Sequence, residues 1–557
     1  MTFKELKVKA KSFEAGDLKL AVAGDVATQF LVTALKGALR CRDLGGELFE
    51  APYNQVVRQV SIEDSELRRF DPDFVVVWEC VEHWWSRCES PEDRLNAVRS
   101  LCDSFPKTVL YVNAAPYMDG VWGNYAATES FAVEVRKFNT DLDVLATERS
   151  NLGIIDLNGL VGLIGRNHAF DPTMFAMSDM PLVPDAQARL AELIADSIAA
   201  RRGMVRKCVV VDLDNTIWGG VVGEDGLEHL QIGDGAIGKV YAGIQRWLLR
   251  LKKRGIILTV CSKNDETVAR EVFDRHPEML LRFDDFACFV ANWKTKADNI
   301  DYIKRVLNIG FDSMVFLDDN PAEREIVRTA HPEVVVPELP NDPAQWLDYL
   351  AAGNYFETAT ASKEDANRTR QYQEEAKRQT WKATFTSQSA YLESLDMEAE
   401  TLPLDPFSIP RVAQLLQRTN QFNLRTIRHG EEVLRNMMGS GDFEAAVFGL
   451  SDKFGDYGIV SAWIGRIDAH SMFIDTWIMS CRVLGRGLEW YALNELVKRA
   501  KARGIRIIEG EYIPTRKNGQ VADLYIKAGF EKISDGKFRL EVENYQRKET
   551  KIHEKKR

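Results

Sequence analysis

Short apolar runs alternate with amphipathic helical stretches along the first two thirds of the chain. Before residue 200 the runs are Leu18–Ala23, Phe74–Trp78, Val109–Asn113 and Gly153–Leu157. After it they are Cys208–Leu213, Ile256–Val260, Phe286–Val290 and Met314–Leu317. Apolar runs of this length, separated by helical patterns, are typical of buried parallel strands joined by right-handed crossovers. The pattern therefore predicts two α/β units, one after the other.

The pattern changes in the last third of the chain. The stretch 356–400 is polar and mostly helical, rich in Glu, Lys, Gln and Arg, which is typical of a linker. Beyond it we expect a third unit with strands at Ala445–Leu450, Gly458–Ile467 and Ser471–Ile478. A basic cluster at 201–207 marks the boundary between the first two units. The predicted organisation is a domain at 1–203, a second at 204–355, the linker at 356–400, a third domain at 401–546 and a charged tail at 547–557.

Length, charge and cysteine spacing narrow the class of protein. At 557 residues the chain is too long for one core. No apolar run approaches the roughly 20 residues that span a bilayer, and the N-terminal stretch lacks the apolar middle of a signal peptide. Acidic residues exceed basic ones by 83 to 72, which disfavours nucleic acid as a partner. We therefore expect a cytoplasmic protein that binds neither membrane nor nucleic acid. Its eight cysteines form no Cys-x-x-Cys pair, so we expect most of them to be reduced.

Polar side chains follow the apolar runs of the second unit. Asp212 and Asp214 end the first run, Ser262 follows the second, and Asp318 and Asp319 end the fourth. Parallel sheets bind their ligands at the carboxyl ends of strands, and an aspartate is a known nucleophile towards phosphorus. We expect one carboxylate of the first pair to attack phosphate and the other to move the proton. The carboxylates of the fourth run would join Asp212 and the Asp214 carbonyl around an oxygen-liganded Mg²⁺.

A lysine that could neutralise phosphate follows the third run. Lys294 and Lys296 both qualify, and Lys296 fits better because the pattern Asn292-Trp293-x-x-Lys296 opens a helix. Surface loops carry such residues by chance. Four strand ends in this order make chance a poor explanation.

This order of residues resembles the haloacid dehalogenase (HAD) superfamily, in the phosphatase branch with Asp-x-Asp-x-Thr. The resemblance implies a Rossmannoid parallel sheet with a small cap. It implies Asp212 as nucleophile and Asp214 as general acid/base. It further implies that phosphate is bound by Ser262, Lys296, Asn215 and Thr216. The implied ligands of Mg²⁺ are Asp212, Asp214 and Asp318. The insertion Trp218–Gly226 is too short for a large cap, which suggests an open site for bulky or protein-borne substrates.

A second motif follows the last long strand. Arg482-x-x-Gly485-x-Gly487 stands at an expected strand-to-helix junction, where backbone N–H groups and the helix dipole attract anions. It resembles the pyrophosphate-binding motif of GNAT acyltransferases, and Asn518 with Leu524–Phe530 matches that family's final helix and strand. The resemblance implies an α+β fold that binds phosphopantetheine or CoA at Arg482, Gly485, Gly487 and Asn518. On its own, the motif is also compatible with an ordinary glycine-rich turn.

Cys481 lies directly before this motif. A thiol before a helix N-terminus and beside an arginine carries a larger thiolate fraction, so we expect a catalytic nucleophile. A buried strand-end cysteine without chemistry is the alternative. Cys261, beside Ser262, is the rival acyl carrier, but its expected place in a buried strand makes it the poorer nucleophile.

Residues from about 18 to 545 together resemble the FkbH-like proteins of the HAD-IIIC subfamily. The most specific marks are Asp212–Gly220, Thr419–Asn423 and Ser480–Gly487. The resemblance implies transfer of a glyceryl or related acyl group from 1,3-bisphosphoglycerate to the phosphopantetheine thiol of an acyl carrier protein, in polyketide-type biosynthesis. The implied partners are that carrier protein and a small phosphorylated three-carbon substrate.

The first domain resembles the SGNH hydrolases in fold and departs from a working esterase in two places. Gly24-Asp25-Val26 stands where the nucleophilic serine would be, and Gly165 takes the acidic position that should precede His168. We therefore predict a non-hydrolytic domain that docks a carrier or serves as a scaffold.

Three other functions compete with carrier loading. They are a phosphatase of a small metabolite, an acetyl-CoA-dependent acetyltransferase with an accessory phosphatase domain, and a docking protein without activity. The intact acids of the second domain count against the docking protein. Cys481 separates carrier loading from acetyl transfer, because direct acetyl transfer needs no protein thiol.

Overall fold

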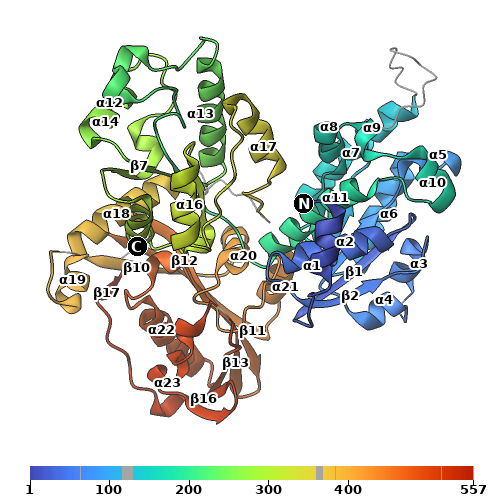
Figure 1. Ribbon diagram of the computed structural model, residues 1–557. Coiled ribbons are helices and arrows are strands. Elements are labelled where there is room, and N and C mark those ends of the chain that lie inside the picture. Colours follow the sequence, from blue (N-terminus) through green and yellow to red (C-terminus); the bar gives the residue numbers. More distant parts are fainter. Residues whose placement is uncertain (63, 116–129, 359–367, 383, 516, 556–557) are drawn as a thin grey trace. The chain divides into compact units, whose positions relative to one another are not determined.

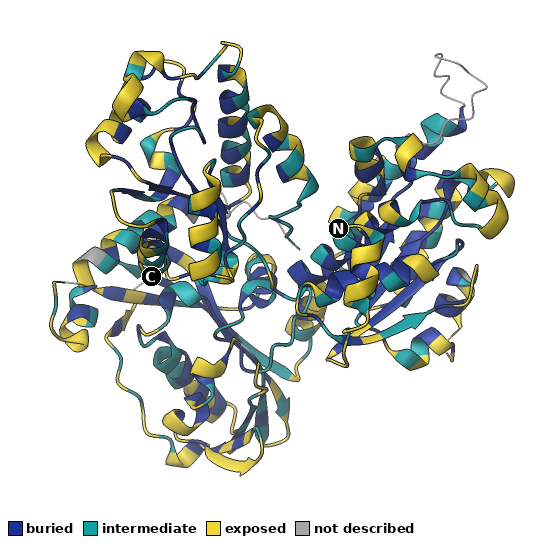
Figure 2. Ribbon diagram, viewed as in Figure 1, coloured by how far each residue is buried: buried dark blue, intermediate teal, exposed yellow. Residues whose placement is uncertain are grey.

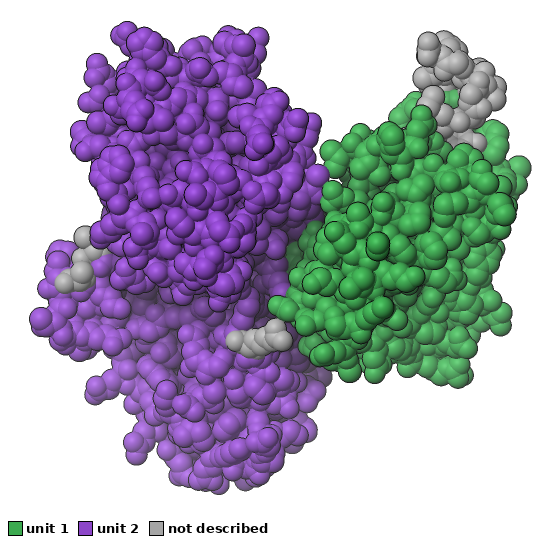
Figure 3. Space-filling view, viewed as in Figure 1, with its two compact units in different colours: residues 1–202 green, residues 203–557 purple. Residues whose placement is uncertain are grey.

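The computed structural model describes the chain except residues 63, 116–129, 359–367, 383, 516 and 556–557. The described chain forms two compact units, Met1–Arg202 and Gly203–Arg557, drawn in green and purple in Figure 3. No described helix combines the length and the apolar character that crossing a bilayer demands.

The first unit is built on a five-stranded parallel sheet with the order β2-β1-β3-β4-β5. Four of its strands are predicted runs, found at β1 (Leu18–Gly24), β3 (Phe74–Trp78), β4 (Thr108–Val112) and β5 (Leu152–Ile155). The prediction missed β2 (Gly46–Glu50). This strand lies at the sheet edge, so its polar and partly exposed side chains form no apolar run.

Helices cover both faces of this sheet (Figure 1). Leu20 and Val22 of β1 pack with α2 (Gln29–Arg40) and α11 (Pro184–Arg201). The alternate residues of β1 pack on the other face with α6 (Pro91–Ser104) and α7 (Phe131–Glu148), because side chains alternate along a strand. Further helices of the unit are α1 (Phe3–Ala10), α3 (Val56–Ser61), α4 (Glu66–Phe70), α5 (Val81–Ser86), α8 (Leu157–Ile164), α9 (Arg166–Ala169) and α10 (Pro172–Ser178).

The second unit begins with a four-stranded parallel sheet ordered β8-β7-β6-β9. Its strands coincide with the predicted runs and are β6 (Cys208–Val211), β7 (Ile257–Ser262), β8 (Phe286–Ala291) and β9 (Met314–Leu317). Val209 and Val211 face one helical layer while Cys208 and Val210 face the other, so β6 is buried on both sides. The neighbouring β7 is buried along its whole length and is drawn in dark blue in Figure 2. The crossover helices are α13 (Gly238–Lys253), α14 (Glu266–Arg275), α15 (Lys296–Leu307) and α16 (Pro321–Ala330).

The predicted linker contributes a helix that contacts both sheets of the second unit. After α17 (Trp346–Ala352), α18 (Arg368–Lys382) places Gln373 within hydrogen-bond distance of β8, at 2.9 Å from the Phe286 carbonyl. Its Arg378 is fully buried, with Nε 2.7 Å from Asp452 Oδ2 of the C-terminal sheet. The predicted linker is mostly helical, but its last residues form a strand. This strand, β10 (Met397–Leu402), follows α19 (Gln388–Ser394).

The C-terminal sheet has eight strands in the order β15-β16-β14-β13-β12-β11-β10-β17. Strands β10 to β13 pair antiparallel, and β13 and β14 pair parallel. The expected charged tail contains a short strand, β17, which pairs with β10. The bounds are β11 (Phe443–Asp452), β12 (Gly455–Asp468), β13 (Ser471–Met479), β14 (Ile507–Glu511), β15 (Glu531–Ser534), β16 (Lys537–Glu541) and β17 (Ile552–Glu554), with helices α20 (Ile409–Arg418), α21 (Glu431–Gly439), α22 (Leu488–Ala502) and α23 (Leu524–Ala528). Two parallel α/β sheets followed by a mixed sheet with helices confirm the predicted fold class.

Candidate active site

The carboxyl ends of four parallel strands meet at one edge of the first sheet in the second unit. Asp212 directly follows β6, Ser262 is the last residue of β7, and Asp318 directly follows β9. Lys296 begins α15, shortly after β8. Strand β6 pairs in register with both β7 and β9, so the residues after these strands share an edge, as the sequence predicts.

Three carboxylates gather around one buried ammonium group at this edge. Asp212, Asp318 and Asp319 place carboxylate oxygens within 4.8 Å of one another. Lys296 Nζ lies 2.5 Å from Asp212 Oδ1 and 2.8 Å from Asp318 Oδ2. It also donates to the Cys261 carbonyl at 3.0 Å. The lysine is 2% exposed, so little water screens its charge from the carboxylates.

The cluster carries more negative charge than the single ammonium group balances. Burial, and then the neighbouring Asp212 carboxylate, raises the pKa of Asp318 and of Asp319. Burial lowers the pKa of Lys296, but the charges of Asp212 and Asp318 outweigh it and hold that pKa above its usual value. Asp212 Oδ1 is buried, and its close polar neighbour is the Lys296 ammonium group at 2.5 Å. Crowded carboxylates with one counter-charge fit a divalent cation that prefers oxygen ligands.

Asp214 stands apart from the three clustered carboxylates. The Trp218 indole N–H and the Val222 backbone N–H donate to its Oδ1 at 2.8 and 3.1 Å. Asn264 Nδ2 donates to its Oδ2 at 2.9 Å. Burial raises the pKa of Asp214, although the hydrogen bonds from Val222 and Trp218 oppose the shift. A carboxyl with a raised pKa and a fixed orientation is suited to giving a proton to a leaving group.

Asn215 and Thr216 shape the loop that carries these acids. Asn215 adopts the left-handed conformation (φ 52°), and its side-chain oxygen accepts the Gly220 N–H at 2.9 Å. The Thr216 hydroxyl accepts the Asp319 N–H at 3.2 Å, which connects the ends of the first and fourth strands. The structure therefore gives both side chains partners within the protein, and direct phosphate contact by them stays a prediction.

The structure distinguishes the two candidate lysines. Lys294 is exposed, whereas Lys296 reaches the carboxylates. Ser262 is buried at the same edge.

The sequence indicated no role for Asn264 and Trp218, whose side chains donate hydrogen bonds to Asp214. The sequence does offer one indication for Asn264, because it lies two residues after Ser262 in the loop that follows β7.

The insertion after β6 is small. It folds into α12 (Val222–Asp225) and a 3₁₀ turn at Leu227–His229, without a separate cap domain in the described chain. The observed loop agrees with the predicted small cap.

The second predicted site lies at the end of β13. Cys481 begins a 3₁₀ turn, and Gly485 and Gly487 adopt φ values of +73° and +85° before α22 starts. L side chains rarely adopt such values, so the glycines are needed for the shape of the turn. Arg482 donates to the side chains of Ser480, at 3.3 Å, and Gln371. The strand, turn and helix thus occur in the predicted order.

A segment of the chain fills the gap between two strands beside this turn. β13 and β14 pair over only three residues and then diverge. The backbone of Phe422–Arg425 lies between them. Met479 N–H donates to the Phe422 carbonyl at 3.1 Å, and Ile513 N–H donates to the Leu424 carbonyl at 2.8 Å. The chain itself therefore satisfies backbone groups that the divergence would leave unpaired.

Asn518 belongs to this internal structure. It is fully buried, and its Nδ2 donates to the carbonyls of Asn423 at 3.0 Å and Ile513 at 2.9 Å. Its Oδ1 accepts the Thr515 N–H at 2.7 Å. Both amide hydrogens are thus engaged within the protein, and contact of Asn518 with CoA or phosphopantetheine stays a prediction. Its side chain holds the loop after β14 against Phe422–Arg425.

The two candidate cysteines differ in accessibility. Cys261 is fully buried in β7, and burial raises its pKa far above the usual value. Cys481 is half-buried and lines a cavity. A thiol must be reached and ionised to act as a nucleophile, so these surroundings favour Cys481.

Comparison with known proteins places these features in a family. The family described as FkbH, N-terminal domain, matches residues 19–199. The N-terminal part of the protein BF1531 from Bacteroides fragilis, which contains a phosphatase domain and was crystallised with Mg, is 45% identical to this chain. The match covers 65% of this chain and 100% of that one, with a TM-score of 0.63. The chain belongs to the FkbH-like family. It therefore carries a HAD-like phosphatase domain.

Two acetyltransferase structures match about a quarter of this FkbH-like chain. The ribosomal-protein-S18-alanine N-acetyltransferase from Escherichia coli is 14% identical and covers 26% of this chain and 94% of that one, with a TM-score of 0.21. The GNAT domain of S. lividans PAT is 15% identical to this chain. The match covers 25% of this chain and 88% of that domain, with a TM-score of 0.21. Among curated proteins, none matches the chain significantly.

The N-terminal domain of this FkbH-like protein contains an acid–imidazole pair that sequence reasoning missed. Asp25 is 1% exposed, accepts the Cys80 N–H at 2.8 Å and lies 3.3 Å from His83 Nδ1. The Asp25 carboxylate raises the pKa of His83. His168, by contrast, is exposed in α9. The predicted non-hydrolytic role of the domain stays a prediction.

Proposed function

We propose that this FkbH-like protein hydrolyses the phosphomonoester of a small three-carbon substrate that also carries an acyl phosphate, and transfers its acyl group to the phosphopantetheine thiol of an acyl carrier protein. The observation that carries the proposal is the buried cluster of Asp212, Asp318 and Asp319 around Lys296. The family resemblance supports a glyceryl group, 1,3-bisphosphoglycerate as its donor and a polyketide-type setting. That donor suits two kinds of chemistry, because it holds both an acyl phosphate and a phosphomonoester.

Mg²⁺ is the metal that the carboxylate cluster fits best. Its ligands are hard oxygen donors, and one ammonium group leaves the cluster with excess negative charge. The homologous phosphatase domain from Bacteroides fragilis was crystallised with Mg. Asp212, Asp318 and Asp319 would hold the ion, together with the Asp214 carbonyl. When bound, it supplies positive charge that neutralises the phosphate oxygens.

Asp212 is the nucleophile of the proposed hydrolysis. One of its oxygens attacks phosphorus, the bond from phosphorus to the substrate oxygen breaks, and the electron pair leaves with that oxygen. Asp214 gives its proton to the leaving oxygen. It then takes a proton from the water that attacks the aspartyl phosphate, and inorganic phosphate leaves. Lys296 orients Asp212 and offsets phosphate charge, while the Ser262 hydroxyl donates to a phosphoryl oxygen.

Cys481 carries the acyl group in the proposed transfer. Its thiolate attacks the carbonyl carbon of the acyl phosphate, a C–S bond forms, and the C–O bond to phosphate breaks. The carrier thiolate then attacks the new thioester, and the Cys481 thiolate leaves. The half-buried position of Cys481 beside basic side chains supports this role, because thiolates need access and nearby positive charge.

Replacing Asp212 tests the hydrolytic part of the proposal. Asp212→Asn keeps the size of the side chain and removes the nucleophile, so release of phosphate from p-nitrophenyl phosphate should fall by about 10³ or more. The matched control is Asp348→Asn, at an exposed position on α17, which should keep the parent rate. An Asp212→Asn enzyme with a tenth of the parent rate would contradict the assignment.

A further inference from the structure

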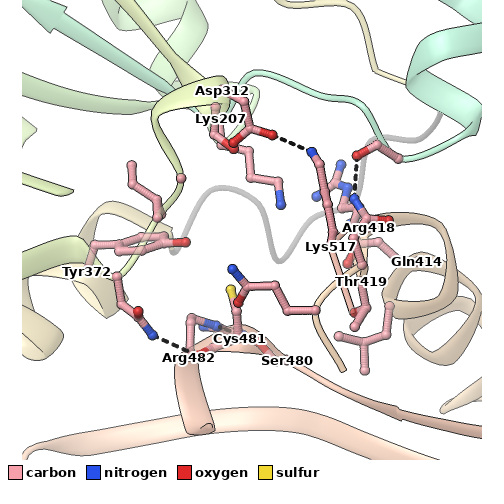
Figure 4. Close-up of a pocket in the computed structure, with 18 of the residues that line it drawn as sticks. Lys207, Asp312, Tyr372, Gln414, Arg418, Thr419, Ser480, Cys481, Arg482 and Lys517 are labelled. Carbon is pink, nitrogen blue, oxygen red and sulfur yellow. Dashed lines mark hydrogen bonds and ion pairs between the residues drawn. The ribbon is translucent and has the colours of Figure 1, made fainter. Parts of the chain in front are cut away.

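A cavity of about 130 Å³ lies between the phosphatase domain and the C-terminal domain of the second unit (Figure 4). One wall comes from the amino edge of the phosphatase sheet, where Lys207 precedes β6 and Ser313 precedes β9. The other wall includes Cys481 and Arg482, in the turn after β13. A water molecule occupies about 30 Å³ of liquid, so the cavity has room for a phosphate group and a few further atoms.

Basic side chains dominate the lining of this cavity. Its cationic residues are Lys207, Arg411, Arg418, Arg482 and Lys517. Among the described lining residues Asp312 is the one acid, and it pairs with Lys517. The whole chain has a net charge of −11, whereas the lining of this cavity has five basic residues and one acidic residue. A recess lined by one sign of charge concentrates ligands of the other sign, and Arg and Lys are the usual phosphate binders.

Cys481 adds a nucleophile to this basic cavity. Figure 4 shows its sulfur on one side of the space and the Lys207 side chain reaching in from the other. Asn308 Nδ2 donates to the Cys481 carbonyl at 3.0 Å, which fixes the turn against the phosphatase domain. A thiol with phosphate-binding side chains around it has the components that attack on an acyl phosphate requires.

This cavity and the Asp212 site lie at opposite edges of the same sheet. Lys207 lines the cavity directly before β6, and Asp212 directly follows that strand. The four residues of β6 separate them, and the five steps of extended chain from Lys207 to Asp212 span about 16 Å. One bound three-carbon substrate therefore cannot reach both sites at once, so a ligand in the cavity binds separately from a ligand at Asp212.

We propose that this cavity binds the phosphate group of a phosphate ester beside the Cys481 thiol and is the place where the acyl group is loaded. The inference rests on the proposed function, since it takes acyl transfer as the reaction. The phosphate belongs either to the acyl phosphate donor or to the phosphopantetheine arm. With the donor bound, Cys481 attacks the carbonyl carbon, and the phosphate leaves with the electron pair of the broken C–O bond among the basic side chains.

The test measures how fast iodoacetamide alkylates Cys481, followed by peptide mass spectrometry on the full chain without Mg²⁺. Inorganic phosphate, 3-phosphoglycerate and 4′-phosphopantetheine are added in separate arms. Only the unliganded fraction reacts, so a phosphate at about nine times its Kd should slow alkylation about tenfold. Protection by 3-phosphoglycerate alone assigns the cavity to the donor. Protection by 4′-phosphopantetheine alone assigns it to the carrier arm.

Charge variants make this test specific. Lys207→Met and Lys517→Met each remove a charge while keeping an aliphatic chain, so about tenfold more phosphate should be needed for the same protection. Lys501→Met, exposed on α22 and outside the lining, is the matched control and should behave as the parent. Thermal unfolding shows whether each variant is folded.

Two outcomes overturn the proposal. One is alkylation that none of the three phosphates slows. The other is protection that is the same in Lys207→Met and Lys517→Met as in the parent. Because alkylation involves no turnover, its result is independent of the Asp212→Asn result, and either proposal can fail alone.

Discussion

Removing the Lys296 ammonium group should destabilise the phosphatase domain in a way that depends on pH and Mg²⁺. In Lys296→Met, Asp212, Asp318 and Asp319 stay within 4.8 Å of one another and lose their buried counter-charge. Removing one partner of a buried ion pair lowers the free energy of unfolding by about 3–5 kcal/mol. Unfolding entropy is about 2.1 cal/mol/K per residue, so for the second unit, Gly203–Arg557, this loss should lower the unfolding midpoint by about 4–7 °C.

The pH dependence follows from the raised pKa values of Asp318 and Asp319. A carboxyl whose native pKa exceeds its unfolded value, about 3.9 for aspartate, binds its proton more tightly in the folded state. Stability is therefore lost as the pH rises from that value through the native pKa. Without Lys296 the native pKa values of both carboxyls rise further. The difference in stability between variant and parent should therefore grow from about pH 5 to pH 7.5. Mg²⁺ should reduce this difference in stability, because it replaces the lost positive charge.

Differential scanning calorimetry at both pH values, with and without Mg²⁺, checks this prediction. Lys294→Met is the matched control, since it removes the same charge from an exposed position two residues away. Surface substitutions of this kind change stability by about 0.5 kcal/mol at most. A Lys296→Met chain as stable as its parent at pH 7.5 without Mg²⁺, or one whose loss of stability is the same at pH 5, would show that Lys296 does not balance the charge of these carboxylates.

Two further substitutions separate the proposed roles. Asp214→Asn should slow hydrolysis of an alkyl phosphate by about 10²–10⁴ and that of p-nitrophenyl phosphate less, because nitrophenolate leaves without a proton. Equal losses on the two substrates would argue against proton donation. Cys481→Ser should stop carrier loading while phosphate release from p-nitrophenyl phosphate stays at the parent rate, and undiminished loading would reject an acyl–cysteine intermediate.

The strands that carry the phosphatase site could be predicted because they are buried on both faces. Such strands have continuous apolar sequences, as in Cys208–Val211, and their carboxyl ends have a known place in the sheet. Edge strands lack that signal. β2 (Gly46–Glu50) and β17 (Ile552–Glu554) have polar sequences, and their pairing depends on neighbours distant in the chain.

The site residues that could not be assigned from sequence are those whose partners come from distant segments. Asn518 follows the pattern of a ligand-binding loop, yet its amide is used by Asn423 and Ile513. The Thr419–Asn423 motif is specific in sequence, and only the divergence of β13 from β14 explains where Phe422 and Asn423 pack. Lys294 and Lys296 differ by two positions, and helix α15 decides which one is buried.

Intact mass spectrometry of a phosphopantetheinylated acyl carrier protein tests the central proposal most directly. The carrier is incubated with the enzyme, Mg²⁺ and 1,3-bisphosphoglycerate, and parallel samples contain the Asp212→Asn or the Cys481→Ser enzyme. We expect the carrier to gain the mass of one glyceryl group with the parent enzyme and none with Cys481→Ser. A carrier that gains no glyceryl mass with the parent enzyme, or that gains an acetyl group when acetyl-CoA is supplied instead, would contradict it.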